Sequence, residues 1–317
     1  MRAYVALTDW DWYRYLRSVE PLDEVNFWKP GGKHKFGALR AGELLLFKLH
    51  SPRSYIVGGG LFAYSSILPV SLAWESFRES NGAASFDEMR RRIERYRKTA
   101  PQPLEDYSIG CVLLSRPFFL SESDWIPVPS DWGRGIQQGK RYDLEKEPGI
   151  SLYRQLEHAL MREASGPGTS MQAHQAHYEL ANRYGTPILM APRLGQGSFR
   201  VIVTDAYERR CAITGEKVLP VLQAAHIRPF SREGPHRVQN GILLRSDLHT
   251  LFDCGYLTVT PDLRIEVSRR LHDDFDNGRD YYALRGTVLR SPLRPDYRPD
   301  PGFLEWHNAN IYRDRAP

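Results

Sequence analysis

The sequence predicts an α+β protein with two domains and a helical connector between them. Residues 1–140 contain runs of β-branched and aromatic residues bounded by Gly and Pro, which is typical of strands. Residues 141–192 show helical apolar periodicity around a flexible SGPGTS joint. Residues 193–317 contain a strand–loop–strand–helix pattern. A length of 317 residues fits this division.

The first part is predicted to be a small curved sheet with interspersed helices. The expected strands are residues 3–7, 43–48, 55–62, 108–115 and 125–128. Three consecutive glycines from Gly58 to Gly60 indicate a bulge or a close approach by another backbone. Helices are expected at 10–16, capped by Thr8 or Asp9, and at 85–96, whose arginine-rich face is expected to be solvated.

The connector begins with an amphipathic helix at residues 151–163. Its apolar side carries Leu152, Leu156, Leu160 and Met161. A second helix is expected at 172–184. The connector is expected to pack on either domain or to form a dimer interface.

In the last part, three polar side chains stand in an apolar pattern. They are His226, Asn240 and His249, at offsets of 14 and 9, and Asp253 follows one helical turn later. Residues 218–227 and 242–244 are predicted strands, and 229–240 is a loop. Ser246 or Asp247 is expected to cap the next helix, which presents His249 and Asp253 on one face. Another hairpin is expected at 256–259 and 265–267, and residues 303–312 close the tail.

This arrangement suits a one-metal phosphodiesterase. A neutral imidazole at His226 can take a proton from water. A divalent ion held by the helix can neutralise a scissile phosphate and stabilise the leaving oxygen. The alternative is that His226 and His249 are core histidines with ordinary hydrogen-bond partners.

The residues His226, Asn240 and His249 resemble the three defining residues of the HNH nuclease family, which has a ββα-metal fold. Their flanking segments resemble the version of this motif in bacterial restriction endonucleases; the segments are AAHIRP, NGILL and LHTLFDCGY. The resemblance implies that His226 is the general base and that Asn240 pins the loop that orients it. It also implies that His249 is a metal ligand, with Asp253 as a second. Many family members place an Asp or His ligand just before the base, where this chain has Ala225. Water, phosphate or an unidentified residue would then complete the coordination.

The donor types favour Mg²⁺ or Mn²⁺, because both ions prefer oxygen ligands. A structural zinc is not expected, because Thr214 follows Cys211 where the second Cys of a Cys-x-x-Cys pair would stand. Three cysteines are too few for a disulfide framework.

The first part resembles the PUA-like superfamily, and most closely its EVE branch, through NFWKPGG, GELLLFKLHSPRSYIVGGG and SIGCVLLSRPFF followed by DWIPVP. The resemblance implies a β-barrel-like domain that reads modified nucleobases. A flipped base needs aromatic faces for stacking and polar groups for its Watson–Crick edge. The alternative is that these aromatic residues are core. The candidate base-binding residues are Trp10, Asn26, Trp28, Phe36, Tyr55, Ser115, Phe118 and Trp125.

Charge favours a polyanionic partner, since the net charge is +5 and the pI is about 9.0. Arg193 and Arg200 are expected to contact phosphate at the start of a helix capped by Ser198, where free N–H groups favour an anion. Lys29, in a lysine-rich loop, and Arg228 are further phosphate candidates. No run of 18 apolar residues exists and the N-terminus lacks the apolar core of a signal peptide, so we expect a cytoplasmic protein with no membrane partner.

Together these features predict a modification-dependent (type IV-like) restriction endonuclease. The substrate would be double-stranded DNA with 5-methyl- or 5-hydroxymethylcytosine, read by base flipping and cut nearby. One catalytic centre cuts one strand per engagement, so a homodimer is expected. The alternatives are a sequence-specific HNH endonuclease on unmodified DNA and a non-cleaving DNA-binding protein on a degenerate HNH scaffold, which Ala225 favours.

Overall fold

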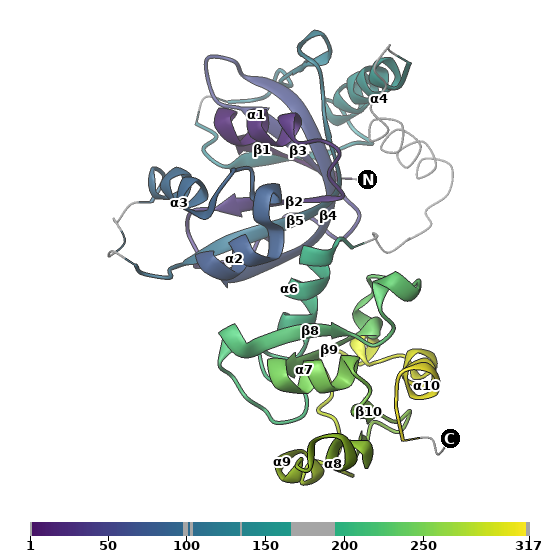
Figure 1. Ribbon diagram of the computed structural model, residues 1–317. Coiled ribbons are helices and arrows are strands. Elements are labelled where there is room, and N and C mark those ends of the chain that lie inside the picture. Colours follow the sequence, from purple (N-terminus) through teal and green to yellow (C-terminus); the bar gives the residue numbers. More distant parts are fainter. Residues whose placement is uncertain (1, 98–100, 102–103, 134, 166–193, 315–317) are drawn as a thin grey trace. The chain divides into compact units, whose positions relative to one another are not determined.

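The structure is a computed structural model of the chain and describes residues 2–97, 101, 104–133, 135–165 and 194–314. The chain divides into two compact units, Met1–Ser198 and Phe199–Pro317, referred to below as unit 1 and unit 2. Unit 1 holds one large sheet with helices, and unit 2 holds two small hairpins with helices (Figure 1). None of the described helices is both long and apolar enough to cross a membrane.

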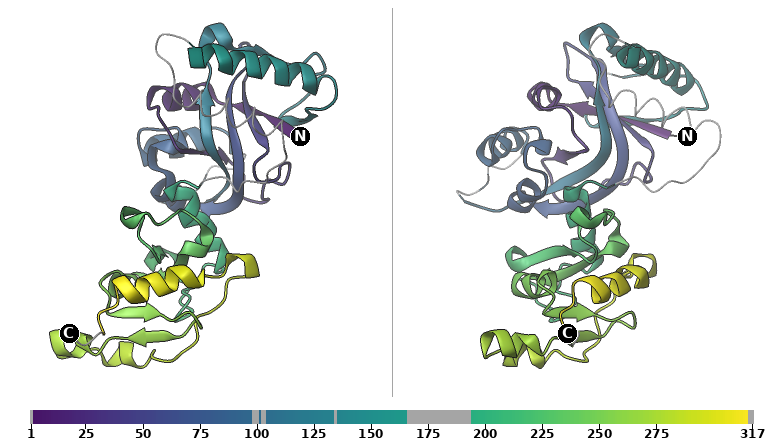
Figure 2. Two further views of the ribbon diagram at one scale, coloured as in Figure 1. Left: turned by 90° about the vertical axis from the view of Figure 1, so that its right-hand side faces the viewer. Right: turned by 45° about the vertical axis from the view of Figure 1, so that its right-hand side comes forward.

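Unit 1 is organised around a mixed sheet of seven strands, shown in two further views in Figure 2. The strand order is β2–β5–β4–β3–β1–β7, with β6 paired to β4. The β1–β3 pair is parallel, and the other pairs are antiparallel. The strands are β1 (Arg2–Thr8), β2 (Glu24–Lys29), β3 (Leu44–Leu49), β4 (Tyr55–Pro69), β5 (Ser108–Phe119), β6 (Ile126–Pro127) and β7 (Gly139–Asp143).

The sheet is open. Strands β2 and β7 stand at its two ends and do not pair with each other, so the barrel closure that the sequence resemblance implies is not seen among the described residues. All five predicted strands are present, whereas β2 and β7 were not predicted. The sequence predicts a loop at the residues of β2, because Trp28 and Lys29 are followed directly by Pro30 and two glycines.

Glycines in β4 lie where neighbouring backbone comes close. A Cβ on Gly58 would stand 2.3 Å from the carbonyl oxygen of Phe118, and a Cβ on Gly59 would stand 2.7 Å from that of Leu45. The β4–β5 register shifts between Gly59 and Leu61, which marks a bulge. The predicted bulge and close approach are therefore confirmed.

Helices cover both faces of this sheet. Helices α1, α2 and α3 lie on one side and α4 on the other (Figures 1 and 2). Leu152, Leu156 and Leu160 of α4 are buried in the core with residues of six strands, as predicted, but Met161 is 48% exposed. The joint and the predicted helix at 172–184 lie outside the described residues. The helical segments of unit 1 are α1 (Trp10–Ser18), α2 (Val70–Phe77), η1 (Arg78–Asn81), α3 (Phe86–Glu94), η2 (Glu122–Asp124) and α4 (Gly149–Ser165).

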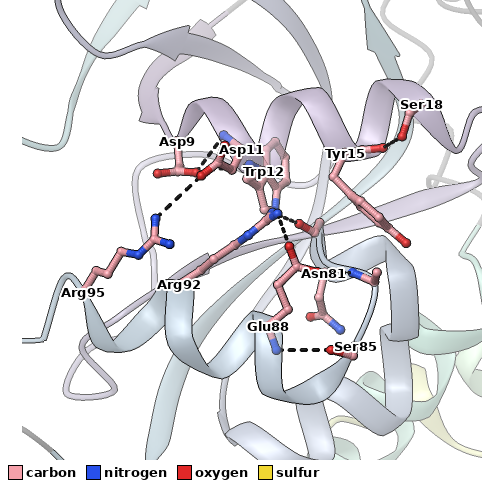
Figure 3. A network of polar contacts seen from close by, with 12 residues as sticks. Asp9, Asp11, Trp12, Tyr15, Ser18, Asn81, Ser85, Glu88, Arg92 and Arg95 are labelled. Atoms are coloured by element: carbon pink, nitrogen blue, oxygen red, sulfur yellow. Dashed lines mark hydrogen bonds and ion pairs between the residues drawn. The ribbon is translucent and has the colours of Figure 1, made fainter.

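A polar network ties α3 to the rest of unit 1 (Figure 3). Arg92 donates to the Glu88 carboxylate at 2.5 Å and to the Gly82 carbonyl oxygen, and Arg95 forms an ion pair with Asp11 on α1. Arg92 is only 8% exposed, so the expectation of a solvated arginine face is wrong for this residue. Its partners compensate for the loss of hydration. Asp9 caps α1 as predicted.

Unit 2 contains the hairpin and helix that the sequence predicts between residues 218 and 253. Strands β8 and β9 pair antiparallel, and α7 follows β9 directly. A second hairpin, β10–β11, lies where residues 256–267 predict it. The elements of unit 2 are α6 (Gln196–Ala206, beginning in unit 1), η3 (Leu219–Val221), β8 (Leu222–His226), η4 (Phe230–Arg232), η5 (Val238–Asn240), β9 (Gly241–Arg245), α7 (Ser246–Asp253), β10 (Leu257–Val259), β11 (Ile265–Val267), α8 (Arg270–Phe275), α9 (Arg279–Tyr282), η6 (Pro295–Tyr297) and α10 (Pro301–Asn310).

The C-terminal helix α10 closes unit 2 through one buried histidine. The His307 ring stacks on Phe252 at 3.8 Å between centroids, and its Nε2–H donates to the Phe252 carbonyl oxygen at 3.1 Å. Its Nδ1 lies 2.8 Å from the Thr258 hydroxyl. Burial lowers the pKa of His307 to about 4, so the ring is neutral at pH 7.

Candidate functional site

His226 is the last residue of β8, and one aromatic ring stacks on its face. Its last ladder partner is Gly241 on β9. The Phe199 ring from α6 stacks on the imidazole at 3.9 Å with an interplanar angle of 14°. The pKa of His226 is lowered to about 4, first by burial and then by repulsion from His236 and His249. A ring with this pKa is neutral at pH 7 and has one nitrogen ready to accept a proton.

The loop between the two strands is closed by Asn240. Its side chain accepts from the Arg228 N–H at 2.9 Å and donates to the carbonyl oxygens of Arg228 at 2.9 Å and Pro235 at 3.0 Å. Asn240 is fully buried. Gly234 lies where a Cβ would stand 1.8 Å from the Arg228 carbonyl oxygen, so the loop folds tightly back on its start. These contacts fix the backbone that follows His226.

His249 and Asp253 meet on α7. The side-chain Oε1 of Gln223 accepts from Nδ1–H of His249 at 2.7 Å, so in the neutral ring the lone pair lies on Nε2. This Nε2 lies 3.2 Å from Oδ2 of Asp253. Two acceptors at such a distance repel unless a proton or a cation lies between them. Burial raises the pKa of Asp253, and the His249 charge opposes the rise.

This His–Asp pair has the donor chemistry of a partial cation site. A ring nitrogen and a carboxylate oxygen on one helix face suit a divalent ion whose remaining positions are filled by water and phosphate. Among the described residues, no group of three His, Cys, Asp or Glu side chains gathers around a common point. Ala225, where many HNH proteins have a ligand, is fully buried. Gln223 orients His249 through Nδ1.

Two local predictions about helix starts are corrected. Helix α7 starts at Ser246 with Arg245 as its N-cap and has no side-chain cap, because Asp247 forms an ion pair with the Arg245 guanidinium at 2.7 Å instead. Helix α6 begins at Gln196, before the expected cap Ser198. The Glu24 carboxylate accepts from the N–H groups of Gly197 and Ser198 at 2.7 and 2.9 Å, which occupies the anion position that we assigned to phosphate.

The predicted phosphate-binding residues are placed as follows. The Arg228 guanidinium donates to the Arg232 carbonyl oxygen at 2.7 Å and lies 5.3 Å from the Trp306 ring. Arg200 is half-buried on α6. Burial lowers the pKa of Lys29, whose ammonium lies 4.8 Å from the Phe36 ring centroid. Arg193 lies outside the described residues.

Unit 1 contains a cavity of about 1120 Å³ beneath the loop that follows β2. Trp28 and Phe36 line it, together with Lys29 and Tyr4. Trp28 lies on β2 rather than in a loop, and its indole N–H donates to the Asn81 carbonyl oxygen at 3.0 Å. Phe36 contacts Tyr4 edge-on at 5.1 Å. The cavity thus presents aromatic faces beside basic side chains.

The other six base-binding candidates lie elsewhere. Asn26, Ser115 and Phe118 are at most 2% exposed and belong to the interior of the sheet, so they do not line the cavity. Asn26 donates to the Asn81 side chain at 2.9 Å. The remaining three, Trp10, Tyr55 and Trp125, form an aromatic cluster of their own. Of the eight candidates, Trp28 and Phe36 line this cavity.

Sequence reasoning missed three residues of the unit 2 site. The sequence pattern assigns no role to Phe199, Gln223 or His236. The Nδ1 atom of His236 lies 3.0 Å from Nε2 of His226. Gly234 is the feature of the sequence that could have indicated the place of His236. A glycine permits a tight turn in this loop, and the turn brings His236 back toward the end of β8.

Comparison with known protein families gives a match. Residues 211–260 match the family model described as HNH endonuclease. The segment is an HNH endonuclease domain, and the protein is a nuclease. No curated protein matches the chain.

Two solved structures are similar to the chain at low identity. A modification-dependent TagI restriction endonuclease shares 16% identity, with a TM-score of 0.27 over 94% of this chain and 78% of that chain. The type IV phosphorothioation-dependent restriction endonuclease ScoMcrA shares 12% identity, with a TM-score of 0.21 over 78% of this chain and 45% of that chain.

Proposed function

We propose that the protein is a modification-dependent, type IV-like restriction endonuclease. Unit 2 would hydrolyse a phosphodiester of double-stranded DNA, and unit 1 would act as an EVE-type reader of 5-methyl- or 5-hydroxymethylcytosine. The observation that carries the proposal lies in unit 2. There a neutral imidazole at the end of β8 and a His–Asp pair on α7 occur in the segment that matches the HNH endonuclease model.

His226 is the general base. Its ring accepts a proton from water, the water oxygen forms a bond to phosphorus, and the bond from phosphorus to the leaving oxygen breaks. The leaving oxygen takes a proton from solvent. Burial lowers the pKa of His226 to about 4, so the ring is unprotonated at pH 7 and able to accept a proton, but it is a weaker base than free imidazole. Stacking on Phe199 fixes the plane of the ring, which limits the directions from which it can accept the proton.

His249 and Asp253 would hold the divalent ion, with Mg²⁺ or Mn²⁺ as the candidates. When bound, the ion neutralises the phosphate and stabilises charge on the leaving oxygen. The facing acceptors at 3.2 Å support this assignment, because a cation relieves their repulsion. In the neutral His249 ring, the Nδ1–H bond to the Gln223 side-chain oxygen leaves the lone pair on Nε2, the atom that would bind the ion.

The cavity of unit 1 would receive the flipped base. Trp28 and Phe36 supply faces for stacking, which is worth roughly 1–3 kcal/mol per base. Lys29, Lys33 and Lys35 lie at the same cavity and suit the flanking phosphates. A methyl group adds only about 0.8 kcal/mol through its buried area, so discrimination requires a close fit around it.

A double-strand break requires two cuts. Each chain has one candidate catalytic centre, so we propose that two chains act together on the duplex as a homodimer, one on each strand. A chain acting alone would nick one strand per engagement.

The test compares matched plasmids that carry cytosine, 5-methylcytosine or 5-hydroxymethylcytosine, with Mg²⁺, Mn²⁺ or chelator. We expect metal-dependent cutting of modified plasmids only. His226→Ala should abolish cutting while DNA affinity stays within about twofold, since general-base catalysis is worth about 10²–10⁴-fold. His272→Ala is the matched control, because His272 is 64% exposed on α8.

The alternatives give different results. Equal cutting of unmodified DNA at a fixed sequence would identify a sequence-specific endonuclease. Binding without cutting in either metal would identify a non-cleaving DNA-binding protein. Full activity of His226→Ala would remove the proposed catalytic mechanism.

A further inference from the structure

We propose that His236 is a positioning residue that selects the reactive nitrogen of His226. It accepts the Nε2–H of His226, and this leaves Nδ1 of His226 as the atom that takes the proton from water. The inference rests on the proposed role of His226 as general base. His236 lies in the loop between β8 and β9 and is not one of the three residues that define the HNH motif, which are His226, Asn240 and His249.

The contact between the two rings is a hydrogen bond between nitrogens. Nε2 of His226 and Nδ1 of His236 are 3.0 Å apart, and the ring planes meet at 62°. A neutral imidazole carries one N–H and one lone pair. One ring must therefore donate and the other accept for this contact to be favourable.

Only one of the two arrangements leaves His226 able to act as a base. If His236 donated from Nδ1, it would occupy the lone pair on Nε2 of His226, and the remaining nitrogen of His226 would carry the proton. If His236 accepts at Nδ1, the lone pair of His226 lies on Nδ1 and is available. The function of His226 therefore requires His236 to be the acceptor.

The loop is built to hold His236 in this place. The Phe230 ring stacks on His236 at 4.5 Å with an interplanar angle of 11°. The preceding residue, Pro235, is fixed through its carbonyl oxygen by Asn240 at 3.0 Å. Stacking on one side and a backbone anchor on the other restrict the ring, so the acceptor is pre-organised before DNA binds.

The same contact helps during the reaction. When His226 takes up the proton it becomes an imidazolium with an N–H on both nitrogens. Nε2–H then donates to the neutral His236 as a charge-assisted hydrogen bond, which is stronger than the neutral one. This hydrogen bond opposes the coulombic repulsion from His236 that lowers the pKa of His226, and His236 does not touch the reacting atoms.

Two substitutions at His236 distinguish the effect of its hydrogen-bond acceptor from the effect of its aromatic ring. His236→Asn keeps a side-chain oxygen near the position of Nδ1 but removes the aromatic ring. His236→Phe keeps the ring that stacks on Phe230 but removes the acceptor. If the acceptor matters, His236→Asn cleaves within about tenfold of wild type and His236→Phe loses about 10²-fold in kcat, with little change in KM. The reverse order would show a packing role only and would overturn the proposal.

A spectroscopic readout does not depend on cleavage. In protein labelled with nitrogen-15 at histidine, the His226 signals are assigned by their loss in His226→Gln. We expect the proton of neutral His226 on Nε2 in wild type and in His236→Asn, and a mixture of both tautomers in His236→Phe. A proton on Nδ1 in the wild-type protein would overturn the proposal.

The two hypotheses fail in distinguishable ways. If the wild-type protein does not cleave any DNA, the proposed function fails, but the tautomer of His226 still reports on His236. If the wild type cleaves and His236→Phe cleaves equally well, only the role of His236 fails. Thermal unfolding of both His236 variants verifies that unit 2 remains folded.

Discussion

The two candidate sites of this protein are assembled in opposite ways. In unit 2, the proposed base and the His–Asp pair proposed to bind the cation come from one hairpin and the helix that follows it. In unit 1, the cavity is lined by residues from Tyr4 to Gln138, which come from separate strands, helices and loops. A site built from neighbouring elements has its residues at a fixed spacing in the sequence. A site built from distant segments has no such spacing.

The comparison also shows where each site is vulnerable. The loop of the hairpin in unit 2 is held by hydrogen bonds of the buried Asn240 side chain. The cavity of unit 1 rests on an extended sheet, so the loss of one wall residue should weaken binding without disturbing the fold. The following predictions test this difference, from the largest expected effect to the smallest.

Asn240→Ala should have the largest effect. It removes three hydrogen bonds that close the loop after His226. Each unpaired buried group costs about 1–3 kcal/mol, and a displacement of about 1 Å at the base costs about 100-fold in rate. Single-turnover cleavage should fall at least about 100-fold. The control is Gln239→Ala, whose exposed amide donates only to the Asp296 carbonyl oxygen, and equal loss in both variants would contradict the role of Asn240.

The stability of unit 2 should depend on pH through His307. Its pKa is about 4 in the folded state and about 6.5 when unfolded, so only the unfolded state binds a proton between these values. The free energy of unfolding should therefore be fully present above pH 6.5 and fall by about 3 kcal/mol as the pH drops to 4.

Urea unfolding between pH 4 and 7.5 measures this dependence. His226 has the same shift and adds to the slope. In His307→Gln the slope should be smaller by the contribution of one histidine. If the pH dependence of the unfolding free energy were the same in His307→Gln and in wild type, the neutral His307 ring of α10 would not contribute to the stability of unit 2.

Asp253→Asn should weaken the use of metal. The amide keeps the size of the side chain but removes the charge that faces His249. The Mg²⁺ concentration for half-maximal cleavage should rise at least about tenfold, since even indirect partners of metal ligands contribute 10–100-fold. Asp276→Asn is the control, because that side chain is 99% exposed at the C-terminal end of α8. Unchanged metal dependence in Asp253→Asn would exclude it as a ligand.

Phe36→Ala should have the smallest effect and should be confined to unit 1. Loss of one stacking face should weaken binding of modified duplex by about 1–3 kcal/mol, or roughly 5- to 150-fold. Tyr55→Ala removes an aromatic ring outside the cavity and should leave affinity unchanged. Fluorescence anisotropy with modified and unmodified duplexes measures both. A larger loss of affinity in Tyr55→Ala than in Phe36→Ala would indicate that the modified base binds at the cluster of Trp10, Tyr55 and Trp125 instead.

The sequence by itself determined the strand–loop–strand–helix order in unit 2 and the placement of His226, Asn240, His249 and Asp253 along it. It could do so because an i, i+4 pair shares a helix face and a buried strand has a recognisable composition. The same local rules predicted the glycine close approach in β4 and the apolar face of α4. These features depend on neighbours along the chain.

The folding of the chain stacks Phe199 on the ring face of His226 and places His236 at Nε2 of the same ring. It separates the eight aromatic and polar candidates of unit 1 into cavity, interior and a separate aromatic cluster. It also placed Trp28 on a strand and buried Arg92. Contacts between residues distant in sequence depend on how the chain folds back, and composition and periodicity carry no record of that path.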